Sequence, residues 1–412
     1  MREPITLNEI DMDDPPVHVL EDGLTHKVLL ALNLPTRWPN WVMVIIGILF
    51  AAIVGVAWYL CLKDARLAQN VALMQALFLA TDAALLHSLP RQKISFGAWQ
   101  AQWMALAIPR LVAACAVAVL ALLVGDIRGF WIFVIVQMAG TLLFLWGAIF
   151  EPFRLGVSEI LVLSDRLPIG TPAIRILHIS DLHVERLTNR EERVVYLSRE
   201  LKPDMIVMTG DYLNLSYNRD PETLKQTKQL LRKFSAPYGV YATLGSPSAD
   251  YRKNVVPLFD GLPIKLLRQE WETVDLGRGR KLVVLGLDCT HLLPLDATHL
   301  AQIMQDAPDD LPQMLLYHSP ELMPEAAAFG VDLYLCGHTH GGQVRLPIIG
   351  PLLTSSQLGR RFVMGLYKIG RTHLYVSRGV GLEGLSAPRV RLFCPPEMTL
   401  VTIVPNGVLK SE

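Results

Sequence analysis

Residues 41–62 contain no charged side chain, and this run limits the folds that the chain can adopt. A helix of about 20 apolar residues is long enough to cross the hydrocarbon core of a bilayer. Aromatic side chains stand near the ends of the run, at Trp38, Trp41 and Tyr59, and Lys63 follows it. Such residues are typical of the membrane interface. The run therefore predicts a transmembrane helix.

Three further apolar runs follow, at residues 71–89, 103–124 and 130–150. Hydrophobic residues make up 51% of the chain and charged residues only 18%, which is unusual for an entirely soluble protein. We therefore predict a transmembrane region of about four helices over residues 41–150. Arg110 stands near the start of the third run, where its long side chain can reach the lipid headgroups.

The second run carries two ionisable residues, Asp82 and His87. Such groups cost a few kcal/mol inside a bilayer unless they face other helices or water. Either Asp82 is buried in a helix bundle, or this segment lies at the interface; we interpret it as a span. A buried hydrogen-bonded pair of these two side chains is the favoured explanation. An ion path, and with it a transporter, is a minor alternative.

Positive charges near the span ends predict the orientation of the helices. With four spans, one side of the membrane holds Lys27, Arg37, Arg91, Lys93, Arg110, Arg154 and Arg166, and the other holds Lys63, Arg66 and Arg128. This bias predicts a multi-pass protein of the cell membrane, with both termini and the soluble part in the cytoplasm. The apolar runs imply the lipid bilayer as a partner. The formal net charge is zero, so we expect no nucleic acid.

The remaining chain divides by composition into a polar N-terminal tail (1–40), a linker (151–173), a soluble α/β domain (174–404) and a C-terminal tail (405–412). In the domain, short β-rich runs alternate with helical ones. Strands are predicted at 174–179, 205–208, 240–244, 281–287, 314–317, 333–335, 373–376 and 398–403. Helices are predicted at 190–201, 222–234 and 299–305.

Four of the predicted strands end in clusters of polar side chains that are typical metal ligands. These clusters contain Asp181 and His183, then Asp211, then His318, and finally His338 and His340. In extended backbone, residues two apart point the same way, so His338 and His340 are predicted to converge on one place. Oxygen and nitrogen ligands without a thiolate suit Zn, Mn or Fe.

Six ligands exceed what one tetrahedral ion needs, so we predict two divalent ions that share a carboxylate. Such pairs of ions polarise a phosphoryl group and activate a hydroxide.

The ordered motifs resemble the calcineurin-like metallophosphoesterases, and above all a bacterial, often membrane-associated branch. The similarity lies in Ile179-Ser180-Asp181-Leu182-His183, Gly210-Asp211, His318 and Gly337-His338-Thr339-His340-Gly341-Gly342-Gln343, with weaker matches at 375–379 and 393–397. The resemblance implies a sandwich of two mixed β-sheets flanked by helices. It also implies that Asp181, His183 and His340 hold one ion, that His318 and His338 hold the other, and that Asp211 bridges them as the central catalytic residue.

One motif departs from the family. Where the family has Gly-Asn-His-Asp, this chain has Gly245-Ser246-Pro247. Ser246 would be a weak ligand in place of the Asn, and Pro247 can neither bind metal nor transfer a proton. An alignment from Asp250 and Tyr251 instead puts Ser248 and Ala249 at these positions, with the same consequence.

Two interpretations of this departure remain open. The first is a slow or specialised hydrolase of a phosphate ester or pyrophosphate, with a lipid-linked substrate suggested by the anchor. The related UDP-diacylglucosamine hydrolases, which this class resembles, also lack the usual His. The second is a catalytically degenerate binding module that keeps the fold at the membrane.

Other polar residues near the motifs receive simpler interpretations. His178 is expected to be a core histidine, Asp204 and Asp250 turn or capping residues, and Arg345 and Arg378 members of salt bridges rather than phosphate contacts. Asn214 is a candidate for orienting Asp211, Gly341 and Gly342 for close backbone approach to the ions, and His291 is a minor candidate to replace the missing His.

Overall fold

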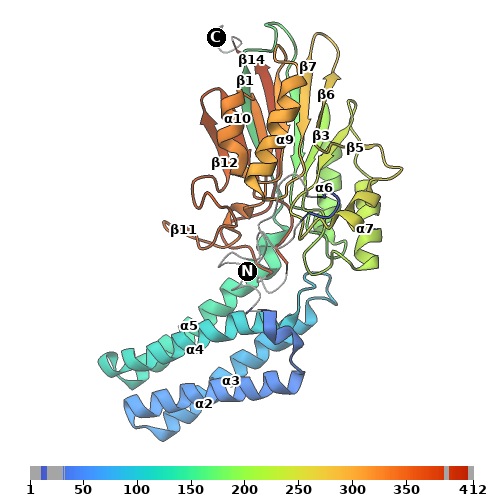
Figure 1. The fold of residues 1–412 in the computed structure, drawn as a ribbon. Helices are drawn as coiled ribbons and strands as arrows, with labels where there is room; N and C mark the ends of the chain where they lie inside the picture. The colour runs from blue at the N-terminus through green and yellow to red at the C-terminus, as the bar shows by residue number, and fades with distance from the viewer. Residues whose placement is uncertain (1–10, 16–30, 32, 385–388, 407–412) are drawn as a thin grey trace, which may run out of the picture. The chain divides into compact units, whose positions relative to one another are not determined.

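The computed structural model describes residues 11–15, 31, 33–384 and 389–406 (Figure 1). The chain forms two compact units. The first contains Leu24–Phe150 and Gly384–Val390, and the second contains Glu151–Glu383 together with the two ends of the chain. Most of the predicted tails at 1–40 and 405–412 lie outside the described residues.

The first unit is a bundle of long helices that are apolar on all sides. Its helices are α2 (Asn40–Leu62), α3 (Ala65–Ser88), α4 (Trp99–Val124) and α5 (Asp126–Leu145), with the short turns η3 (Leu34–Arg37) before them and η4 (Trp146–Phe150) after them. Within the described residues, four helices are long and apolar enough to cross a membrane, the fourth running on to Phe153. The prediction of about four membrane-spanning helices is confirmed as far as helix length and composition can show.

Two charged residues of the bundle, Asp82 and Arg110, pair with each other in its interior. Arg110 is 6% exposed, and its Nε and Nη2 atoms lie 2.6 and 3.0 Å from the two carboxylate oxygens of Asp82. Arg110 also donates to the Gln137 carbonyl at 2.8 Å and to the Thr141 hydroxyl at 2.7 Å. The predicted burial of Asp82 in a bundle is therefore confirmed.

Two details of the prediction were wrong. Because α4 begins at Trp99, Arg110 lies in mid-helix, where it pairs with Asp82 instead of reaching the headgroups. His87 is exposed and does not pair with Asp82; its ring meets the Trp99 ring edge-on at 6.3 Å.

The second unit contains two mixed six-stranded sheets, as predicted. The order of the first sheet is β1 (Gly156–Ser164), β14 (Glu397–Pro405), β2 (Ile174–Ile179), β3 (Met205–Thr209), β4 (Val240–Thr243) and β5 (Ile264–Leu266). The order of the second sheet is β12 (Gly365–Ile369), β13 (Thr372–Val376), β9 (Leu333–Cys336), β8 (Gln313–Leu316), β7 (Lys281–Gly286) and β6 (Glu270–Asp275). A small pair, β10 (Arg345–Leu346) and β11 (Gly350–Pro351), lies apart.

The two sheets pack face to face, because the inward side chains of their strands are apolar. Ile176 and Val207 of the first sheet share one buried core with Leu316 and Leu335 of the second. The outer faces are covered by α6 (Asn189–Glu200) and α7 (Pro221–Leu231) on the first sheet, and by α9 (Leu293–Asp306) and α10 (Met323–Phe329) on the second (Figure 1). Short helical turns are α8 (Arg252–Val255), η5 (Glu151–Phe153), η6 (Val256–Leu258), η7 (Pro320–Leu322) and η8 (His340–Gly342).

The segment 151–173, predicted to be a linker, is part of the sandwich. It contains β1, whose nine residues pair in parallel with β14, from Gly156 opposite Glu397 to Ser164 opposite Pro405. Seven of its nine residues are half-buried or exposed at the sheet edge, although Ile160-Leu161-Val162-Leu163 is an apolar run that could have indicated a strand.

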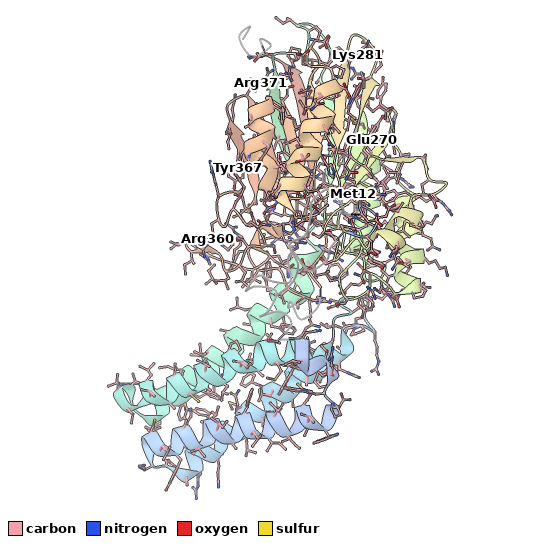
Figure 2. The ribbon with its side chains drawn as sticks, viewed as in Figure 1. Met12, Glu270, Lys281, Arg360, Tyr367 and Arg371 are labelled. Carbon is pink, nitrogen blue, oxygen red and sulfur yellow. The ribbon has the colours of Figure 1, made fainter. Side chains whose placement is uncertain are left out.

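Part of the predicted N-terminal tail also packs against this unit. Met12, labelled in Figure 2, accepts a hydrogen bond on its carbonyl from Arg268 Nη2 at 3.1 Å. Asp13 pairs with Arg268 at 2.7 Å, and Asp14 pairs with Lys253 at 2.7 Å. Residues 11–15 are thus held on the α/β unit by charge, although their composition is typical of an unpacked tail.

Candidate metal centre

The six predicted ligands follow the carboxyl ends of four buried strands. Asp181 and His183 follow β2, and Asp211 follows β3, which pairs with β2 in parallel. His318 follows β8, and His338 and His340 follow β9, which pairs with β8 in parallel. Because parallel strands end at the same edge of their sheet, each sheet brings its own polar residues together.

The structure collects the six side chains into two groups of three. Asp181, His183 and His340 form the first group, and Asp211, His318 and His338 form the second. Within each group the candidate ligand atoms lie within 4.8 Å of one another, and all six residues are buried. This division matches the one that the resemblance implies, with Asp211 placed in the second group.

The ligand atoms in each group lie at distances that fit coordination of a metal ion. His183 Nε2 lies 3.0 Å from His340 Nε2, and two imidazoles bound to one ion at about 2.0–2.1 Å have a similar separation. Asp181 Oδ2 is buried without a hydrogen-bond partner. Unpaired buried polar atoms are costly, so each group fits a divalent cation.

One carboxylate oxygen belongs to both groups. Asp211 Oδ2 lies 3.6 Å from His183 Nε2 and 3.2 Å from His318 Nε2. Although burial alone would raise it, the pKa of Asp211 is held below its usual range by the His318 and His183 imidazoles. Burial would lower the pKa of His318, but the Asp211 carboxylate raises it to about 10. The side chain of Asp211 is therefore negative, as a bridging ligand must be.

His338 and His340 both reach the site, in different groups, but not through the extended backbone that we predicted from the sequence. β9 ends at Cys336, and beyond it the backbone is not extended: φ is 70° at His338 and 51° at His340. Asp181 and His183 do share a group, but their φ values of 52° and 42° are also in the left-handed region. Non-glycine residues in this region are strained and often mark functional sites.

The glycines at which the backbone comes close to the ligand side chains are not Gly341 and Gly342, the two that were predicted. A Cβ at Gly337 would lie 1.9 Å from Asp181 Oδ2, and one at Gly245 would lie 2.2 Å from Asp211 Oδ1. Gly341 and Gly342 instead approach Cys394 and Pro351. Close backbone approach to the ligands therefore occurs at Gly337 and Gly245.

Asp250 does more than cap a turn, the role predicted for it. Its Oδ2 accepts the backbone N–H groups of Asp211 and Gly245, each at 2.8 Å, and its Oδ1 accepts that of Tyr212 at 2.8 Å. Arg252 lies on the same turn and donates to the Asp250 carbonyl at 2.8 Å. This buried carboxylate fixes the backbone that carries Asp211.

We expect Asp250→Ala to destabilise the protein by about 3 kcal/mol or more, because three buried N–H groups lose a charged acceptor. Thermal unfolding of the full chain in detergent would measure the change. Asp310→Ala, at an exposed position, is the control and should unfold like the wild type. Equal stability of all three proteins would contradict this role for Asp250.

Of the remaining predicted residues, His178 and Arg378 have the expected roles. His178 contacts the Thr209 hydroxyl at 2.8 Å in the core, and Arg378 pairs with Glu397 at 2.5 Å. The other three differ from the prediction. Asp204 pairs with Arg280 at 3.2 Å, Arg345 donates to the Gly341 carbonyl at 2.8 Å, and Asn214 donates to the Leu382 carbonyl at 2.9 Å instead of orienting Asp211.

Two side chains at the site received little or no weight from the sequence. His291 is buried, with Nε2 3.0 Å from Ser246 Oγ, and burial lowers its pKa well below the usual value. Arg391 is also buried, with Nη2 3.4 Å from His340 Nδ1. His291 follows β7, another parallel strand of the second sheet. This position after a strand is the sequence signal that made His291 a minor candidate.

A sandwich of two mixed sheets with two groups of Asp and His ligands at the strand ends defines a metal-dependent phosphoesterase fold. Residues 174–342 match the family described as calcineurin-like phosphoesterase. The chain belongs to this family, whose members use two divalent metal ions.

Three of the relatives of this chain come from bacteria. The metallophosphoesterase YkuE of Bacillus subtilis, which is uncharacterised, is 31% identical over 61% of this chain and 87% of its own length. An uncharacterised metallophosphoesterase of Aquifex aeolicus is 30% identical over 62% of this chain and 95% of its own length. The phosphodiesterase YaeI of Escherichia coli is 28% identical over 56% of this chain and 82% of its own length.

Proposed function

We propose that this chain is a membrane-anchored, metal-dependent phosphoesterase that hydrolyses a phosphate ester or a pyrophosphate. The observation that carries the proposal is the place of Asp211 Oδ2, within 3.6 Å of His183 and 3.2 Å of His318. One oxygen shared by two ligand groups is the arrangement that a two-ion hydrolase needs. When bound, two divalent ions polarise the phosphoryl group and activate water for attack.

Hydrogen bonds from neighbouring residues hold the ligand side chains in position. Asp250 holds the backbone of Asp211, and the Thr209 carbonyl accepts from His318 Nδ1 at 2.8 Å, leaving Nε2 as the donor atom. His183 Nδ1 lies 3.3 Å from the Leu213 carbonyl, which leaves Nε2 in the same way. Such contacts fix the tautomer and orientation of ligating imidazoles.

The altered loop at Ser246 and Pro247 is compatible with hydrolysis of substrates that have a good leaving group. General acid assistance contributes typically about 10² to 10⁴-fold, so its loss slows such an enzyme without removing the chemistry of the ions. The name of the Escherichia coli relative supports a diester as substrate. The apolar helices support a substrate held in the membrane, because tethering raises its local concentration.

The test is hydrolysis by the full-length protein in detergent with added Mn²⁺, first of a chromogenic phosphodiester and then of lipid-linked nucleotides and lipid phosphates. Turnover of a lipid-linked phosphate in preference to its water-soluble head group would support the proposal. Cleavage of soluble esters alone would reject the lipid-linked substrate. No turnover at all, with the ions bound, would favour a degenerate binding module.

We further propose that the α/β unit lies on the cytoplasmic side of the cell membrane, on the grounds of the Lys and Arg bias between the spans. A fluorescent protein fused to the C-terminus should then be bright, and alkaline phosphatase fused there should be inactive. The reverse result would place the unit on the other side.

A further inference from the structure

The two ligand groups differ in their number of donors. The first group has three side chains and shares Asp211, which makes four. The second group has Asp211, His318 and His338, which makes three. The altered loop begins at Gly245, and Ser246 donates its backbone N–H to Asp211 Oδ1 at 2.7 Å. The second group therefore lacks a donor on the side where this loop lies.

His291 lies beside this incomplete group. Its ring centroid is 4.7 Å from that of His338 and 6.4 Å from that of His318, and the residue is 3% exposed. Ser246 Oγ lies 3.0 Å from His291 Nε2. The Cys289 thiol lies 3.6 Å from Nε2 and 3.7 Å from Nδ1, and a thiol is only a weak partner.

The backbone of His291 lies in the left-handed region, as does the backbone of most of the candidate ligands. Its φ is 61°, and five of the six candidate ligands also have φ between 42° and 70°. A strained, buried histidine at the end of a parallel strand, against two other histidines, is not explained by packing alone.

We propose that His291 completes the ligand set of the second ion, and that Ser246 positions its ring. The Ser246 hydroxyl accepts Nε2–H, so Nδ1 remains as the donor nitrogen, and an imidazole is a better ligand than a serine hydroxyl. The pair of side chains thus compensates for the missing Asn of the family motif. This inference rests on the two-ion site of the proposed function.

The test measures binding of the ion and not turnover. Metal-free, full-length protein in detergent is titrated with Mn²⁺, and the free ion is followed by electron paramagnetic resonance. The wild type should bind two ions per chain. In His291→Ala the affinity for one ion should fall by more than about 100-fold, and in Ser246→Ala by about 10 to 100-fold, since loss of a supporting contact costs less than loss of a ligand.

Two controls separate loss of a ligand from loss of the fold. Added imidazole should restore the second ion to His291→Ala, which a damaged fold would not allow. His299→Ala, on α9, should bind two ions like the wild type.

Three results would overturn the inference: unchanged binding in His291→Ala, a larger loss in Ser246→Ala than in His291→Ala, or equal loss of both ions without rescue by imidazole. Two bound ions without turnover in the wild type would reject the proposed hydrolase but not this ligand.

Discussion

Asp211→Ala should lower hydrolysis by about a thousand-fold or more and weaken the binding of both ions. Its Oδ2 lies close to imidazoles of both groups, at 3.6 and 3.2 Å. In the proposed site, removal of the carboxylate would take a ligand from each ion and would also remove a negative charge that offsets the two cations. Loss of a ligand from one group alone, as in His340→Ala, should spare the other ion more.

The measurement is metal content per chain together with turnover of a chromogenic phosphodiester by full-length protein in detergent. Asp310→Ala, at an exposed site, is the matched control and should keep two ions and full turnover. If Asp211→Ala keeps both ions and hydrolyses at the wild-type rate, the carboxylate is not shared and the proposed site is wrong.

Asp82→Ala should destabilise the helical bundle by about 3 to 5 kcal/mol, the usual cost of leaving one member of a buried ion pair without its partner. Arg110 would remain buried with only the neutral oxygens of Gln137 and Thr141 as acceptors. The double variant Asp82→Leu, Arg110→Leu removes both charges. It should be more stable than Asp82→Ala, because well-packed apolar residues often replace a buried ion pair without loss.

Unfolding of the full chain by added denaturing detergent, followed by circular dichroism, would compare these variants. Asp126→Ala, at the exposed start of α5, should behave like the wild type. If the double variant is less stable than Asp82→Ala, the cost of Asp82→Ala does not come mainly from the unpaired charge of Arg110. The expected result would then be wrong.

The sequence predicted the fold well where the strands are buried. The eight predicted strands correspond to β2, β3, β4, β7, β8, β9, β13 and β14, because continuous apolar runs are required in strands covered on both faces. The missed strands include β6 and β12, which are edge strands with half-exposed residues. β1 was missed although it contains the apolar run Ile160-Leu161-Val162-Leu163, and a fragment that begins at Ile174 would lack this edge of the sandwich.

The candidate ligands were identified correctly as neighbours, but their geometry was not. Polar residues at the ends of buried strands are visible in sequence, whereas the φ values of His338 and His340 are set by the turn and by contacts from other strands. The partner of Asp82 and the contact between His291 and Ser246 join residues that are 28 and 45 positions apart. Such pairings depend on packing, and a pattern of spacing does not contain them.

The place of β14 in the first sheet has a consequence for biosynthesis. β14 lies between β1 and β2, so the last strand of the chain joins two of the first strands of its domain. The ribosome has to make more than 230 residues after β1 before its partner exists, from Ser164 to Glu397. During that time β1 has an open edge, which favours association with other chains. A premature stop before residue 397 should therefore yield aggregated or degraded protein instead of a partly active enzyme.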